Sequence, residues 1–119
     1  MKKYTAKFFL GYLSQIPRNQ WTVGTLKNEA NQSCVLGLCG VKDGDSLGPY
    51  QYSTMGQQLK DLFDIHVGLN PLDVNDYEYH LCDKNAQSLT TSKGFTISGK
   101  HPKTRVIRAI KFIIRKQSK

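Results

Sequence analysis

The last fifth of the chain constrains the fold most, because apolar and basic residues recur there with the period of an α-helix. Pro102 suits the first turn of such a helix, where its missing amide hydrogen has no partner to lose. The apolar face consists of four residues at three- and four-residue spacing: Val106, Ile110, Ile113 and Ile114. We therefore expect an amphipathic, basic helix from about residue 102 to 116 that packs its apolar face into the core.

Two earlier segments have the same period. Residues 5–16 place Phe9, Leu13 and Ile16 on one face, and Pro17 ends the run. Residues 54–67 open with Thr54 and Gln57 at capping-box spacing. The expected buried face of this second segment is Met55, Leu59, Leu62, Phe63 and His66. We expect helices near 5–16 and 54–67, the second ended by Gly68.

The remaining segments are short and rich in turn formers. The stretch "WTVGTL" suits a short strand or hairpin, and two more short strands are expected near 77–81 and 95–97. Residues 33–41 read as strand or short helix; caps at Asn31 or Ser33 and at Gly40 slightly favour a helix. The predicted fold class is α+β, mainly helical, and residues 1–119 are expected to form a single compact domain.

The charges are segregated along the chain. All nine acids lie between Glu29 and Asp83, and eight bases with no acid follow from Lys100 to the end, giving a net charge of +8. Such asymmetry indicates an anion-binding surface or, equally, a basic helix neutralised by packing on the acidic middle. No apolar run approaches the roughly 20 residues that span a bilayer, so no membrane partner is expected.

Three cysteines, with no cleavable leader ahead of them, indicate free thiols in a reducing, cytoplasmic setting. Cys34 could be a nucleophile if one of three histidines served as its base. Those histidines are His66, His80 and His101. The aliphatic neighbours of Cys34 favour a buried, inert thiol instead.

Metal binding has two candidate segments. Cys34, Cys39, His80 and Cys82 supply four soft ligands, but their spacing differs from compact zinc knuckles, and core thiols are the preferred interpretation. Residues 73–83 fail the calcium-loop pattern. We expect no metal and no cofactor.

Two groups of residues could contact a ligand. Asn75 and Asp76 either form side-chain turns or read the donors and acceptors of a ligand. At the start of the terminal helix, Lys100, Lys103 and Thr104 could hold a phosphate. Arg105, Arg108, Lys111 and Arg115 would continue the positive charge; the alternative is a solvated basic face.

Five short pieces of the chain resemble a pattern in small uncharacterised proteins of bacteria and their phages. They read W-T-V-G-T-L, C-V-L-G-L-C-G, L-x-x-L-F, V-N-D and P-x-x-R-x-x-x-A-I. The matching positions are Trp21, Gly24, Cys34, Gly37, Gly40, Leu59, Leu62, Phe63, Val74, Asn75, Asp76, Pro102, Arg105, Ala109 and Ile110. The resemblance implies a small, mostly helical domain in which the Trp, Cys-Gly and Asn-Asp segments meet, and an origin on a mobile element. It transfers no activity.

These observations predict a non-enzymatic binding protein, an accessory factor of a phage or mobile element in the bacterial cytoplasm. Its ligand would carry phosphate, as a nucleotide signal or a nucleic acid. The expected ligand-binding residues are Asn75, Asp76, Lys103, Arg105 and Arg108. Two alternatives stay open: an inhibitor of a host protein, and a small cysteine-dependent enzyme using Cys34. The apolar final helix also allows a homo-oligomer.

Overall fold

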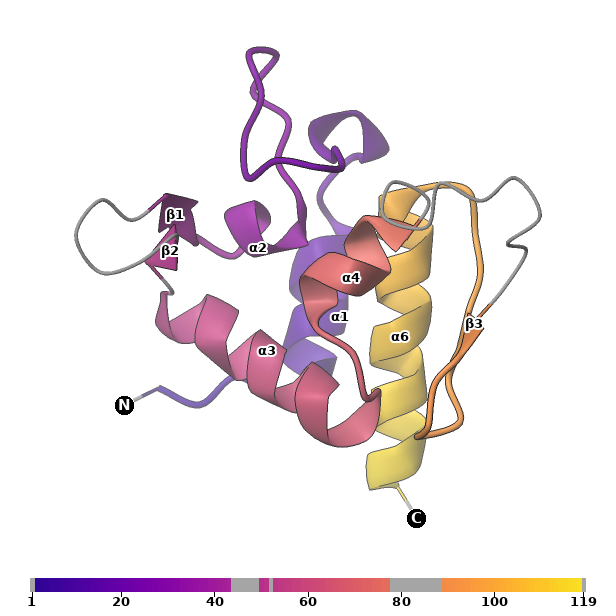
Figure 1. The fold of residues 1–119 in the computed structure, drawn as a ribbon. Helices are drawn as coiled ribbons and strands as arrows, with labels where there is room; N and C mark the ends of the chain where they lie inside the picture. Colours follow the sequence, from indigo (N-terminus) through magenta and orange to yellow (C-terminus); the bar gives the residue numbers. More distant parts are fainter. Residues whose placement is uncertain (1, 44–49, 52, 78–88, 119) are drawn as a thin grey trace.

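Helix α6 (Pro102–Gln117) is the longest helix that the structure describes, and the other α-helices pack against it. The computed structural model describes residues 2–43, 50–51, 53–77 and 89–118 (Figure 1). Within them, α6 contacts α1 (Ala6–Ser14), α2 (Val35–Leu38), α3 (Thr54–His66) and α4 (Pro71–Asn75). The prediction of a mainly helical α+β fold with three principal helices is confirmed.

The principal helices begin at side-chain caps. The Thr5 hydroxyl accepts a hydrogen bond from the Phe8 amide at the start of α1 (3.0 Å). At the start of α3, the Ser53 hydroxyl accepts one from the Gly56 amide (2.9 Å). Ser53, one residue before Thr54, is therefore the cap, and the capping box expected at Thr54 is wrong. Gly68, with φ of +86°, ends α3 as predicted.

The β structure consists of two antiparallel pairs of two-residue strands. β1 (Lys42–Asp43) pairs with β2 (Tyr50–Gln51), and β3 (Leu89–Thr90) pairs with β4 (Thr96–Ile97). The strand expected near 95–97 is confirmed, whereas the one expected near 77–81 lies, beyond Tyr77, outside the described residues. The short strand or hairpin expected in "WTVGTL" is not formed: the stretch has one isolated bridge, from Trp21 to Ser33, and the next residue, Lys27, has another to Ser33.

Within residues 33–41, Val35–Leu38 form the short helix α2, as the capping signals favoured. Its N-cap position is Cys34, not Asn31 or Ser33, and Gly40 follows it with φ of +87°. A Cβ atom on Gly37 would collide with the carbonyl oxygen of Leu26. Glycine at position 37 therefore lets the loop before α2 pack directly on the helix.

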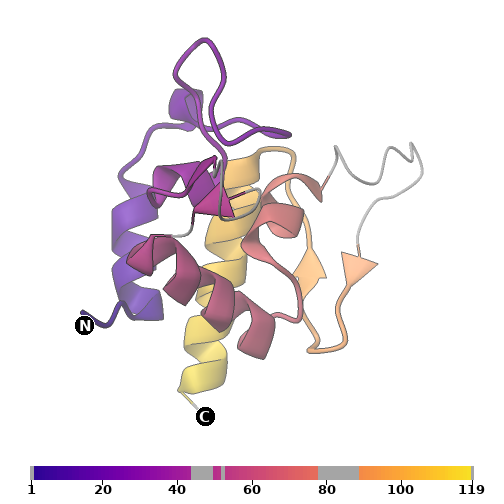
Figure 2. The same ribbon diagram turned by 60° about the vertical axis from the view of Figure 1, so that its left-hand side comes forward.

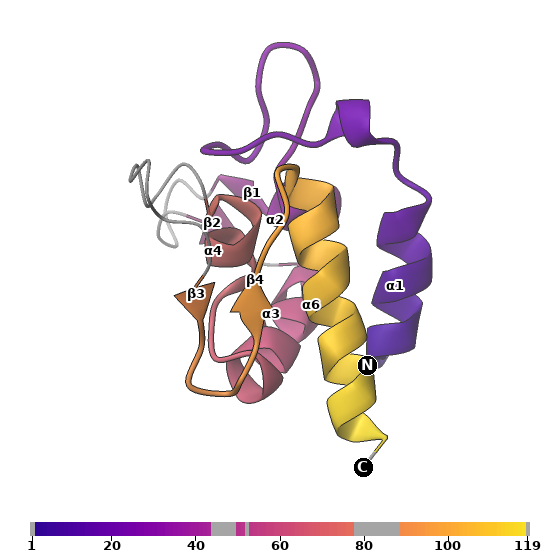
Figure 3. The same ribbon diagram turned by 90° about the vertical axis from the view of Figure 1, so that its right-hand side faces the viewer.

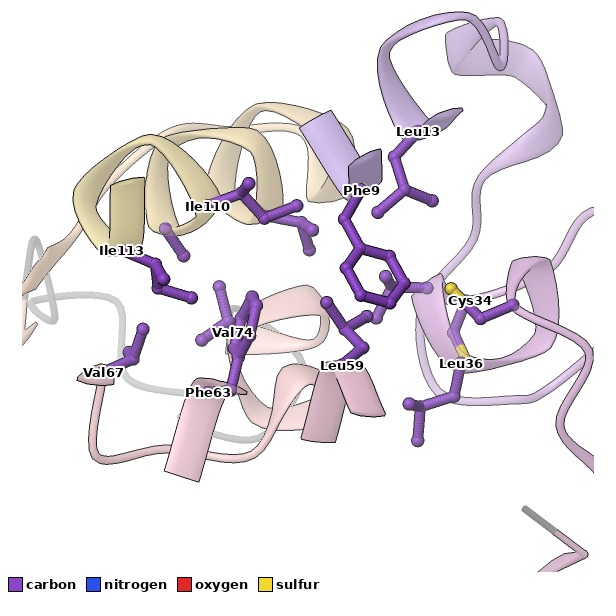
Figure 4. Close-up of a cluster of buried hydrophobic side chains, with 14 of the residues drawn as sticks. Phe9, Leu13, Cys34, Leu36, Leu59, Phe63, Val67, Val74, Ile110 and Ile113 are labelled. Atoms are coloured by element: carbon purple, nitrogen blue, oxygen red, sulfur yellow. The ribbon is translucent and has the colours of Figure 1, made fainter. Parts of the chain in front are cut away.

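One cluster of buried apolar side chains joins α1, α2, α3, α4 and α6 (Figure 4). The close-up labels ten of them: Phe9, Leu13, Cys34, Leu36, Leu59, Phe63, Val67, Val74, Ile110 and Ile113. Val106, Ile110 and Ile113 are fully buried, as the period of the last helix predicted, while Ile114 is half-buried. Each fully buried large aliphatic side chain contributes about 1.5–3 kcal/mol, so this cluster accounts for the packing of the helices on α6.

Helices α1 and α6 lie side by side and run in opposite directions (Figure 3). The Lys103 ammonium in the first turn of α6 donates a hydrogen bond to the carbonyl oxygen of Ser14, the last residue of α1 (2.8 Å). A 3-10 turn, η1 (Arg18–Gln20), follows α1 and leads into the long loop that rises above the helices (Figure 2). The first and last helices of the described chain thus lie against each other.

Candidate functional site

Asn75, Asp76 and Arg105 meet inside the protein and are named the buried polar cluster. The Oδ1 atom of Asn75 accepts a hydrogen bond from the amide of Val35 (3.0 Å). Its Nδ2 atom donates to the carbonyl oxygen of Thr22 (2.9 Å) and to Oδ1 of Asp76 (2.6 Å). One side chain therefore ties the end of α4 to the start of α2 and to the residue after Trp21.

Arg105 holds the same end of α4 from the side of α6. Its Nε atom donates to the carbonyl oxygen of Val74 (3.1 Å), and Nη2 donates to that of Asn75 (2.6 Å). Its Nη1 atom donates to the carbonyl oxygen of Gly99 (3.0 Å). The last carbonyl oxygens of a helix have no hydrogen-bond donor within the helix, and here the guanidinium of Arg105 supplies the donors.

The three residues of the buried polar cluster are almost completely shielded from solvent. The exposed fractions are 0% for Asn75, 2% for Asp76 and 1% for Arg105. Arg105 is thus absent from the exposed row that continues with Arg108, where the sequence had placed it. The reason is helical phase: Arg105 lies three residues after Pro102 and four before Ala109, both of which are buried.

The thiol of Cys34 lies in the core beside Leu36 (Figure 4). Burial raises its pKa, although the amides of Gly37 and Leu36 act in the opposite direction, and the Asp76 charge raises it further. Burial also raises the pKa of Cys39 to about 12. Burial thus disfavours the thiolate form of both side chains, which is the form that a nucleophile or a zinc ligand needs.

The other residues of the zinc hypothesis, His80 and Cys82, lie outside the described residues. Within residues 2–43, 50–51, 53–77 and 89–118, no three histidine, cysteine, aspartate or glutamate side chains gather closely enough to hold a metal. Among the described helices, none has both the length and the apolar character needed to cross a bilayer.

The outer side of α6 carries a second group, named the basic strip: Lys103, Arg108, Lys111 and Arg115. The Lys103 side chain is half-buried at the boundary with α1, and the other three are exposed. Arg108 donates from Nη1 to the Ser98 hydroxyl (2.9 Å), at the boundary with the β3–β4 hairpin. The side chains of Lys111 and Arg115 have no hydrogen-bond or ion-pair partner among the described residues. The strip therefore fills the solvent-facing surface between α1 and the hairpin.

The N-terminal segment, whose helix α1 packs against α6, carries further positive charge. Lys7 is exposed on α1, and Nη2 of Arg18 donates to the Thr104 hydroxyl on α6 (3.4 Å). His101, the N-cap of α6, has a lowered pKa because it is partly buried and because Arg18, Arg105 and Lys103 lie near it. Burial and the nearby positive charges thus both disfavour protonation of His101.

The exposed acids of the described residues lie on other elements. They are Glu29 in the loop before α2, Asp61 and Asp64 on α3, and Asp73 on α4. The one ion pair within the described part of the chain joins Lys60 to Asp64 on α3 (3.0 Å). No described carboxylate therefore forms an ion pair with a residue of the basic strip.

Two pockets formed by described residues lie away from the strip. One, of about 370 Å³, lies between the N-terminal residues and α3 and is lined partly by Tyr4, Leu62 and Ile65. The other, of about 340 Å³, lies between the loop before α2 and β1 and is lined partly by Lys27, Gly37 and Lys42. No residue of α6 lines either pocket.

Sequence reasoning identified Lys103 and Arg108 but not the contribution of Lys7 and Arg18 on the opposite end of the chain. The signal for them is the absence of any acid in residues 1–28, which matches the acid-free stretch 84–119. Comparison with protein-family models, curated proteins and solved structures finds no match to this chain. The fold and the two groups of residues define a small helical protein with an internal polar cluster and an external basic face.

Proposed function

We propose that the chain is a non-enzymatic binding protein that holds the phosphate groups of a nucleic acid. The binding surface, named the basic face, consists of the basic strip together with Lys7 and Arg18. One observation carries the proposal: the two acid-free ends of the sequence fold against each other as α1 and α6. The basic residues that are separated from the acids along the sequence are therefore also separated from the exposed acids that the structure describes.

Such a face suits phosphate for electrostatic reasons. Lysine and arginine side chains that neutralise phosphates release condensed counterions, and this release drives much of the binding to nucleic acid. Lys111 and Arg115 are exposed and lack described partners, so a phosphate would displace only water from them. Arg108 already uses one nitrogen for Ser98 and keeps its other donors for a ligand.

A polymer fits this face better than a small nucleotide does. The strip is an exposed row on a helix, and the two pockets described above are formed by other segments. Small-molecule sites are usually concave and bury most of the ligand. The phosphates of a nucleic acid can instead run along an open surface and contact several lysine and arginine side chains at once.

The cysteine-enzyme alternative receives no support from the surroundings of Cys34. The residue has an exposed fraction of 0%, and burial raises its pKa. The resemblance to phage and bacterial proteins makes an accessory role on a mobile element part of the proposal. In that role the protein would act by occupying nucleic acid.

The salt dependence of binding tests this proposal. We expect the affinity for a fluorescent DNA duplex to fall between about 50 and 200 mM salt, with a log–log slope of about −4 if the four strip residues contact phosphates. The double variant Lys111→Gln/Arg115→Gln should bind about tenfold more weakly or worse, and its slope should be smaller in magnitude by about 2. Fluorescence anisotropy measures both quantities.

The matched control is Lys27→Gln/Lys42→Gln, which removes the same charge from exposed positions on other elements. It should keep the wild-type slope. Equal losses in the two double variants would show that net charge alone drives binding, and no binding by the wild-type protein at about 50 mM salt would overturn the proposal.

A further inference from the structure

We infer that the partner of the basic face is duplex nucleic acid, bound through its backbone and without preference for base sequence. The inference rests on the proposed function and specifies its ligand. It follows from three observations: the state of the aromatic side chains near the face, the depth at which α6 is packed, and the residue types along the strip.

The aromatic side chains of α1 and α6 are engaged within the protein. Phe8 stacks on Tyr12 (ring centroids 5.8 Å apart, planes at 8°), and the Tyr12 hydroxyl donates to the carbonyl oxygen of Leu38 (2.7 Å). Phe112 packs on Phe95 (5.2 Å), and the Lys116 ammonium lies over the Phe112 ring (5.2 Å).

No aromatic side chain whose exposure the structure describes is more than half-exposed. Proteins that bind single strands rely on exposed aromatic rings, each of which gains about 1–3 kcal/mol by stacking on a base. The basic face offers charge without such a platform. This combination favours a duplex, whose bases are already stacked on one another.

The packing of α6 limits what it can reach. The helix has α1 along one side and β4 along the other, with α2, α3 and α4 behind it (Figure 3). A recognition helix must enter the major groove to read base edges. Because α1 and β4 flank the strip, these neighbouring elements would meet the duplex backbone before α6 reached the bases.

The residue types along the strip agree with backbone contact. From Lys103 to Arg115, the positions that are not buried carry Lys, Arg, Thr, Ile and Phe, and none carries Asn or Gln, the residues that pair with adenine. The strip spans about 18 Å at 1.5 Å per residue. Its lysines and arginines would contact phosphates, which fix position and carry no sequence information.

Three probes of equal length, about 20 base pairs or nucleotides and thus longer than the strip, test the inference by anisotropy at low salt. They are a DNA duplex of mixed sequence, a duplex with the same bases shuffled, and one strand of the first duplex. We expect the two duplexes to bind equally within about twofold and the single strand to bind about tenfold more weakly, because it has lower charge density and no platform to stack on.

Two results would overturn the inference while leaving the proposed function intact: a single strand that binds as tightly as the duplex, or a difference of tenfold or more between the two duplexes. Failure of all three probes to bind would overturn the proposed function itself. If binding uses the basic face, the Lys111→Gln/Arg115→Gln substitutions should lower the affinity for both duplexes by the same factor.

Discussion

The side chain of Arg105 connects three parts of the fold, because its donors reach the carbonyl oxygens of Val74, Asn75 and Gly99. Arg105→Met would keep much of the side-chain volume but leave these buried acceptors without their donors. We expect a loss of about 3 kcal/mol or more in the free energy of unfolding. Urea denaturation monitored by circular dichroism measures it.

Arg108→Met is the matched control, because Arg108 lies one turn further along α6 and is exposed. Surface substitutions of this kind usually change stability by less than about 0.5 kcal/mol. Equal urea midpoints for the two variants would contradict a structural role for Arg105 and would return it to the list of candidate ligand-binding residues.

The raised pKa of Cys39 predicts a loss of stability at alkaline pH. An unfolded cysteine ionises near pH 8.5, whereas burial holds the folded thiol protonated up to about pH 12. Its contribution to stability is therefore complete below about pH 8.5 and declines as the pH rises toward the folded value. By pH 10 the loss reaches about 2 kcal/mol, at about 1.36 kcal/mol per pH unit.

The comparison of wild-type protein with Cys39→Ala isolates this effect, because other groups titrate alike in both. The stability difference between the two proteins should shrink by about 2 kcal/mol between pH 7.5 and pH 10, as measured by urea midpoints. A difference that stays constant over this interval would mean that the Cys39 thiol ionises as readily when folded as when unfolded.

At the scale of elements, Ser53 links two helices. Its hydroxyl accepts from the Gly56 amide at the start of α3 and donates to the carbonyl oxygen of Cys39 at the end of α2 (2.6 Å). Ser53→Ala should lower the free energy of unfolding by about 1 kcal/mol or somewhat more.

Thr54→Ala provides the contrast, since the capping-box pattern had placed the cap at Thr54 and the structure places it at Ser53. We expect a change of less than about 0.5 kcal/mol for Thr54→Ala in the same denaturation measurement. A larger cost for Thr54→Ala than for Ser53→Ala would show that the helix begins where the sequence pattern indicated.

The elements that the sequence predicted well are those long enough to repeat. Helices α1, α3 and α6 have 9, 13 and 16 residues, so each shows several apolar positions at helical spacing. Helix α4 has five residues and was missed, although Asn70 caps it and Pro71 opens it. Five residues contain too little of the helical period to distinguish a helix from a turn.

The buried polar cluster could be predicted only in part. The resemblance implied that the Asn-Asp and Cys-Gly segments meet, and the bond from the Val35 amide to Asn75 spans 40 positions of the chain. No local pattern specifies such a contact. The burial of Arg105 agrees with its phase with Pro102 and Ala109, but a charged residue is rarely buried, so the phase alone does not predict it.

At the scale of the whole molecule, the fold brings charges together that the sequence keeps far apart. Residues 1–28 and 84–119 contain no acid, and they meet through α1 and α6. The exposed acids described in the structure lie on α3, α4 and the loop before α2. This separation of charge is the physical basis for assigning phosphate binding to one face.

A titration of ¹⁵N-labelled protein with a DNA duplex, followed by backbone amide chemical shifts, tests this assignment most directly. We expect the largest shifts on the exposed residues of α6, including Arg108, Lys111 and Arg115, and on Lys7 of α1. Asp61 and Asp64 on α3 should shift little. Shifts centred on α3 and α4 with α6 unchanged would contradict the account.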